Sequence, residues 1–144
     1  MTPSRFRTLA ISILATLAFA LPIPAQADLV LTRQALMKEI GQTAFFIFRG
    51  MIDRTEGAEI IADNFADVAT MFPEGSQGGH ALPPVWSDHA GFLAILGRAQ
   101  DGAEALLEAA EAGDDTIFME RLRALDEVCT ECHRTYREPL DAAQ

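Results

Sequence analysis

The only two cysteines of this 144-residue chain lie three residues apart near its C-terminal end. Cys129 and Cys132 belong to the stretch Cys-Thr-Glu-Cys-His, which ends at His133. Two thiols followed directly by an imidazole are compatible with a disulfide, a redox site, a zinc site or covalent attachment of haem. The rest of the sequence distinguishes among these chemistries.

Each alternative to haem attachment lacks something that it requires. Two cysteines three apart on a continuous helix point in similar directions, so a disulfide between them would strain the helix. A thioredoxin-like site needs a βαβ context, which the sequence does not indicate. A zinc site needs further ligands at suitable spacing, and only His80 and His89 remain. Cys-x-x-Cys-His on an exported helical chain is instead typical of c-type haem attachment.

This chemistry explains the spacing of the motif. Cys129 and Cys132 would form thioether bonds to the haem vinyl groups. His133, next in the sequence, would then be the proximal axial ligand of the iron. We therefore predict one covalently bound haem c per chain.

The first 27 residues have the organisation of a cleavable export signal. Two arginines precede an apolar run at 9–21, two prolines follow the run, and Ala25-Gln26-Ala27 offers small residues for cleavage. The run is about 13 residues long, shorter than the roughly 20 that span a bilayer as a helix. We predict a Sec signal peptide at 1–27, a mature domain at 28–144, a periplasmic location and no stable membrane insertion after cleavage.

The chain is strongly acidic, with a formal net charge of −10 at pH 7. Loss of the signal peptide removes two arginines and no acid, which makes the charge about −12 by subtraction. Binding to nucleic acid is not expected, because phosphates require Lys and Arg. The excess of acid is compatible with solubility alone, and equally with acidic faces that favour redox partner proteins with basic surfaces.

Apolar residues recur at steps of three and four through most of the mature chain, which predicts amphipathic helices. We expect helices over about 29–53, around 61–72, from near Ser87 to Gly113, and from Asp114 or Asp115 to near Pro139. An irregular stretch rich in Gly and Pro, 72–85, separates the second and third helices. The predicted fold class is all-α, an antiparallel four-helix bundle enclosing a covalently attached haem.

Several motifs in this order make the chain resemble the cytochrome c′ family, the four-helix-bundle class II c-type cytochromes. They are Thr-Arg-Gln-Ala-Leu-Met at 32–37, Phe-Pro-Glu-Gly-Ser at 72–76, Leu-Pro-Pro-Val-Trp-Ser-Asp at 82–88, and Cys-Thr-Glu-Cys-His-Arg-Thr-Tyr-Arg at 129–137. Together they cover nearly all of the mature chain. The low-spin, Met-ligated relatives of this family are included in the resemblance.

The resemblance implies roles for residues outside the haem motif. Met37 would face the distal side of the haem as the second axial ligand, Arg33 would interact with a propionate, and Arg137 would lie at the proximal haem face. Trp86 is expected to pack beside the haem. The competing interpretation of Met37 is a core residue on a helical stripe, because Met often fills gaps in cores.

Two functions follow, and neither requires a catalytic acid or base, so we predict that the protein is not an enzyme. The first is single-electron transfer through a haem with His133 and Met37 as axial ligands. The alternative is a five-coordinate haem that binds or buffers NO or CO. The family resemblance also admits a homodimer formed through the first two helices.

Overall fold

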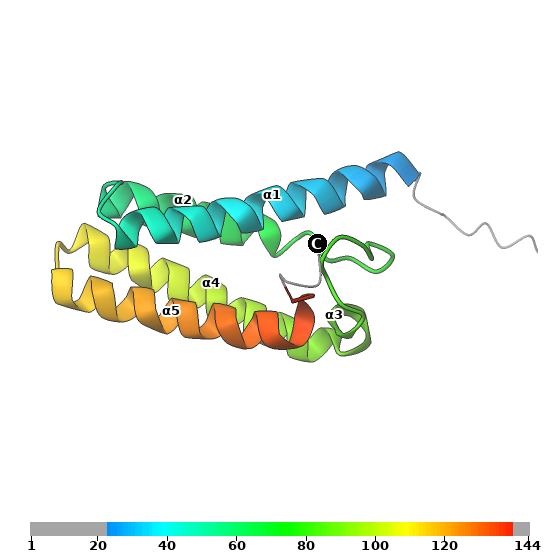
Figure 1. Cartoon of the computed structure of the whole chain (residues 1–144). Coiled ribbons are helices and arrows are strands. Elements are labelled where there is room, and N and C mark those ends of the chain that lie inside the picture. Colours follow the sequence, from blue (N-terminus) through cyan, green and yellow to red (C-terminus); the bar gives the residue numbers. More distant parts are fainter. Residues whose placement is uncertain (1–22, 140–144) are drawn as a thin grey trace, which may run out of the picture.

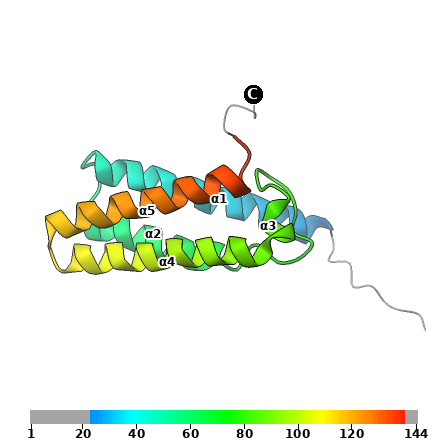
Figure 2. The same ribbon diagram turned by 90° about the horizontal axis from the view of Figure 1, so that it is seen from below.

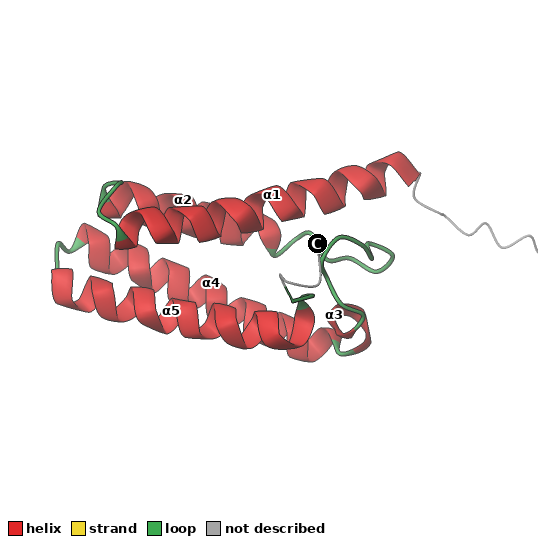
Figure 3. Cartoon of the chain, viewed as in Figure 1, coloured by secondary structure: helices red, strands yellow, loops and turns green. Residues whose placement is uncertain are grey.

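The computed structural model describes residues 23–139 and is helical throughout its core (Figure 1 and Figure 3). The helices are α1 (Ile23–Phe48), α2 (Arg54–Val68), α3 (Pro84–Ser87), α4 (His89–Glu111) and α5 (Asp115–Tyr136). The four long helices run antiparallel to one another, and the short α3 lies at one end of the bundle. The predicted all-α four-helix bundle is confirmed.

The long helices pack in sequence, with α1 on α2, α2 on α4 and α4 on α5 (Figure 2). Each contributes an apolar stripe to one continuous core, as the spacing of three and four predicts. The most deeply buried large side chains of this core are Phe118, Ile61, Leu106, Val68 and Val85.

Helix ends follow local chemistry. The Asp53 side chain accepts hydrogen bonds from the backbone N–H groups of Thr55 and Glu56 at the start of α2, and Asp114 caps α5 in the same way. Gly113 has a φ of +68°, as expected of the residue that follows a helix C-terminus. The predicted cap and stop between α4 and α5 are therefore confirmed.

Several predicted boundaries are wrong. The first helix begins at Ile23 rather than near residue 29, and the second is Arg54–Val68 rather than about 61–72. The first helix ends at Phe48 rather than near Asp53, because Gly50 adopts a φ of +63° and ends the helical path. Met51, which the predicted helix over about 29–53 included, lies beyond the end of α1 and is 66% exposed. The third long helix, α4, begins at His89, and Ser87 is instead the last residue of α3, a helix too short to give a periodic signal.

Residues 69–83 form the irregular connection between α2 and α3, and we refer to them as the 69–83 segment. It lies across the end of the bundle where α5 ends. Ala81 forms an antiparallel bridge with Arg137. The amide of Leu82 donates to Tyr136 O (3.0 Å), and the amide of Glu138 donates to His80 O (2.9 Å).

The predicted signal peptide falls largely outside the described residues, which begin at residue 23. The predicted cleavage position after Ala27 lies within α1, which starts at Ile23. Among the helices of residues 23–139, none has the length and apolarity needed to cross a bilayer.

Truncating the core should destabilise the bundle. Leu106 on α4 is fully buried, so we expect Leu106→Ala to lower the free energy of unfolding by about 2–5 kcal/mol through lost burial and a residual cavity. Leu93→Ala is the matched control, because Leu93 lies on the same helix and is 45% exposed. Urea denaturation followed by circular dichroism measures both, and equal losses would contradict the described core.

Candidate haem site

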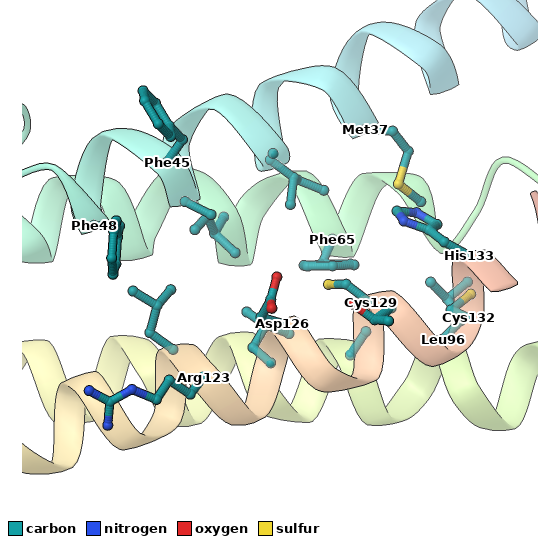
Figure 4. Close-up of a pocket in the computed structure, with 18 of the residues that line it drawn as sticks. Met37, Phe45, Phe48, Phe65, Leu96, Arg123, Asp126, Cys129, Cys132 and His133 are labelled. Atoms are coloured by element: carbon teal, nitrogen blue, oxygen red, sulfur yellow. The ribbon is translucent and has the colours of Figure 1, made fainter. Parts of the chain in front are cut away.

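The haem-attachment motif lies in the last two turns of α5, and its side chains face α1. Cys129, Cys132 and His133 are all half-buried, and both cysteines are free rather than bridged. Figure 4 shows the Met37 thioether and the His133 imidazole pointing toward one another from α1 and α5. The structure therefore brings together four residues that the sequence assigned to the iron or its attachment.

Two neighbouring cavities meet at these residues. The first, of about 530 Å³, lies between α1 and α5, and the second, of about 570 Å³, lies toward the 69–83 segment. Met37, Cys132 and His133 line both cavities. Each volume falls in the range of cofactor sites, roughly 300–1,000 Å³.

The first cavity is largely apolar. The described residues that α1 contributes to it are all nonpolar: Met37, Ile40, Gly41, Ala44, Phe45 and Phe48. Phe65 of α2 and Leu96 of α4 add further apolar surface. Such a lining suits the hydrophobic faces of a porphyrin ring.

The second cavity has the opposite character to the chain as a whole. Among the described residues that line it are Arg33, Lys38, His80 and Arg137, and none is an Asp or Glu. The chain nevertheless has 21 acidic residues against 11 Lys and Arg. A concentration of positive charge without carboxylates suits an anionic group, and haem carries two propionates.

Arg137 supplies a more specific indication of a missing acceptor. Within residues 23–139, its Nε is the one buried side-chain nitrogen or oxygen that has no hydrogen-bond partner. Buried donors are almost always paired in folded proteins, so an unpaired one calls for an acceptor from a bound group. The lining residues therefore fit haem in their polarity, their charge and their donor set.

The electrostatics of the motif favour neutral side chains. Burial, reinforced by Asp126, raises the pKa of the Cys129 thiol to about 11. Burial, reinforced by Glu131, raises the pKa of the Cys132 thiol to about 11. A protonated thiol binds metals poorly and oxidises slowly, because the thiolate is the reactive form.

The same burial, aided by the positive charge of Arg137, lowers the pKa of His133. The imidazole is then neutral at physiological pH, and neutral imidazole is the form that binds a metal. Within residues 23–139, no three His, Cys, Asp or Glu side chains gather as a metal-binding group.

A charged pair fixes the motif against α4. Glu131, between the two cysteines, accepts a hydrogen bond from Arg98 Nη2 at 2.5 Å. The Arg98 side chain and Glu131 side chain are about half exposed, so the pair contributes little to stability by itself. It does hold the outer side of the motif to α4 while the cysteines and His133 face the cavities.

The predicted haem contacts of Arg33 and Trp86 are less direct. Arg33 lines the second cavity, but its guanidinium already donates to three backbone carbonyls of the 69–83 segment. Trp86 is half-buried, and its indole N–H donates to Pro73 O at 3.1 Å. It is not among the residues that line either cavity, so its packing beside the haem stays a prediction.

Lys38, His80, Asp126 and Phe65 line the cavities although sequence reasoning did not assign them to the site. Lys38 was expected on the outer face of its helix. It is exposed and yet follows Met37 directly, which brings its stem to the rim of the second cavity. No spacing signal marks Lys38 and His80 as cavity residues, because their positions depend on how α1 and the 69–83 segment meet α5.

Comparison with known proteins agrees with this geometry. Residues 28–137 match the family model described as Cytochrome C′. The chain is 39% identical to a cytochrome c′ of Pararhodospirillum photometricum over 56% of this chain and 67% of the relative. It is 31% identical to a cytochrome c′ of Rhodospirillum rubrum over 70% of this chain and 71% of the relative.

Solved structures show the same architecture. Cytochrome c prime from Alcaligenes xylosoxidans superimposes with a TM-score of 0.73 at 25% identity, covering 79% of this chain and 97% of that one. A mutant of the same cytochrome, solved as its nitric oxide complex, gives a TM-score of 0.72 at 25% identity, with 79% and 97% coverage. The four-helix fold of this chain is thus shared with these solved cytochromes.

Removing either thiol tests the attachment chemistry. Cys129→Ala or Cys132→Ala should reduce the fraction of haem that stays with the polypeptide under denaturing conditions, because each removes one thioether bond. Haem-stained denaturing gels and mass spectrometry measure this fraction. Unchanged retention in both variants would contradict the assignment of the cysteines.

Proposed function

This chain belongs to the cytochrome c′ family, whose members carry one covalently bound haem c per chain, and we propose that it binds small neutral gases such as NO and CO at that haem after export to the periplasm. Family membership rests on the match over residues 28–137 and on the relative from Rhodospirillum rubrum. The gas-binding role was the alternative interpretation of the sequence, and the relatives support it better than electron transfer.

The proposal assigns the proximal side to α5. Cys129 and Cys132 tether the cofactor, and His133 supplies an imidazole that burial keeps neutral. Arg137, with its unpaired Nε, and Lys38 offer donors for anionic groups at the second cavity. An iron with one protein ligand has an open coordination position that diatomic gases fill.

The observation that carries the gas-binding proposal is the polarity of the distal side. Every described residue that α1 contributes to the first cavity is nonpolar. Such a surface accepts an uncharged diatomic molecule and excludes water and anions. In the first cavity α1 contributes no His or Arg that would assist cleavage of an O–O bond. Its Arg33 lines the second cavity but donates to three backbone carbonyls of the 69–83 segment. The proposal accordingly makes the protein a binding protein rather than an enzyme.

Relatives support the same function. The nitric oxide complexes solved for cytochrome c prime from Alcaligenes xylosoxidans concern a protein with this fold. Under this proposal Met37 covers the open position as an apolar side chain, packed against the hydrophobic core as the structure has it.

Electron transfer with Met37 as a ligand is the second candidate, and one observation favours it. The Met37 thioether points toward His133 (Figure 4), as two axial ligands on opposite sides of an iron would. A His/Met pair raises the reduction potential and blocks the site to small ligands. The acidic surface would then serve docking to basic redox partners.

A homodimer is part of the proposal as well. Phe46 of α1 and Met51, which follows the end of that helix, are exposed and line neither cavity, whereas the exposed Phe45 and Phe48 also line the first cavity. Exposed apolar residues so close together are typical of an interaction surface.

The coordination state distinguishes the two functions. We expect the purified ferric protein to have a high-spin optical spectrum without the weak long-wavelength sulfur-to-iron band, and the ferrous protein to bind CO. Met37→Leu should leave the ferric spectrum high-spin, because Leu keeps an apolar side chain of similar size. A low-spin spectrum that Met37→Leu converts to high-spin would overturn the gas-binding proposal in favour of electron transfer.

A further inference from the structure

Arg33 is the most deeply buried charged residue described in the chain. It is 3% exposed, and burial lowers its pKa. Its guanidinium lies 4.6 Å from the centre of the Phe72 ring and 5.8 Å from that of Trp86. A buried cation of this kind requires compensation by acceptors or aromatic faces.

The acceptors are backbone carbonyls of the 69–83 segment. Arg33 Nη1 donates to Met71 O (3.1 Å) and Ser76 O (3.3 Å), and Nη2 donates to Gly78 O (2.8 Å). These three carbonyls are spread over eight residues of irregular backbone. The guanidinium of Arg33 presents N–H donors on separate nitrogens and can bond all three carbonyls at once. The ammonium group of a lysine has a single nitrogen and cannot span them.

A second contact joins the same segment to α1. Gly78 and Gly79 have φ values of +136° and +61°. A Cβ added at Gly79 would lie 2.9 Å from Gln34 Nε2 and 3.1 Å from a methyl carbon of Val30. Glycine is therefore needed both for the backbone conformation and for the close approach to α1.

The other side of the segment is joined to α5. The Ala81–Arg137 bridge and the amides of Leu82 and Glu138 pair its backbone with the end of that helix. Arg137 is four positions after His133, and Arg33 is four positions before Met37. The 69–83 segment thus links α1 to α5 about one helical turn away from Met37 and from His133, at the same end of the bundle.

We propose that Arg33 is a positioning residue that fastens the 69–83 segment to α1, and that the segment in turn closes the bundle end by holding α1 to α5 across the cavities. That this closure matters for the haem, through the distance between Met37 and His133, rests on the proposed function. The fastening itself depends only on the contacts of the described residues. Arg33 keeps two N–H groups free of these carbonyls, so contact with a propionate is compatible with this role.

Amide hydrogen exchange of the haem-loaded protein tests the fastening. Exchange at the amides of Leu82 and Glu138 reports the pairing of the segment with α5, which Arg33 does not itself contact. We expect Arg33→Lys and Arg33→Met to accelerate exchange at both amides by about tenfold or more, the effect of losing hydrogen bonds from a charged donor. Arg49→Lys, at an exposed arginine that directly follows the end of α1, is the control and should leave both rates unchanged.

The lysine variant separates fastening from charge alone. If Arg33 served only as a positive charge toward a propionate, Arg33→Lys would keep the wild-type exchange rates, and that result would overturn the proposal. Faster exchange spread equally over the core amides of α2 and α4 would also overturn it, since it would indicate general destabilisation.

A glycine pair provides a test without any change in charge. Gly79→Ala should accelerate exchange at Leu82 and Glu138 more than Gly75→Ala. Both positions have positive φ, but only Gly79 contacts α1, because a Cβ at Gly75 would meet nothing within 4 Å. Equal acceleration in the two variants would mean that backbone strain causes the faster exchange, and it would contradict a role for the contact of Gly79 with α1. The optical spectrum and CO binding are separate readouts, so failure of the gas-binding proposal leaves these rates unaffected.

Discussion

The space kept open between α1 and α5 is the constraint on which the rest of the structure depends. Amphipathic helices usually close on one another wherever both present apolar faces. Here α1 packs on α2 and α5 packs on α4, while the apolar faces that α1 and α5 turn toward each other line a cavity. The haem motif lies on one wall of that cavity and Met37 on the other.

Charge is distributed around this space in a way that the net charge conceals. The acidic residues dominate the composition, yet the described lining of the second cavity is cationic. An apolar cavity and a cationic cavity that share Met37, Cys132 and His133 match the two parts of haem, a hydrophobic ring and anionic propionates. The unpaired Nε of Arg137 belongs to the same arrangement, because an acceptor bound at the second cavity would pair it.

The sequence was informative where local spacing decides the outcome. Steps of three and four predicted the four long helices, Asp114 and Gly113 predicted the connection of α4 to α5, and the cysteine spacing predicted the haem motif. It was uninformative where tertiary contacts decide. The end of α1, the short α3, and the cavity positions of Lys38 and Phe65 depend on where the 69–83 segment and neighbouring helices come to lie.

The same division separates the two sides of the candidate site. Cys129, Cys132 and His133 are fixed relative to one another by five consecutive residues of a single helix, so α5 alone determines their geometry. Met37 reaches His133 only through the packing of α1 on α2 and through the backbone pairing of the 69–83 segment with α5. A residue placed by so many contacts can move by small amounts without any change in the motif. Relatives with one haem motif and one fold can therefore differ in whether a distal Met binds the iron, and the decisive differences should lie in the contacts that position α1 rather than in the motif.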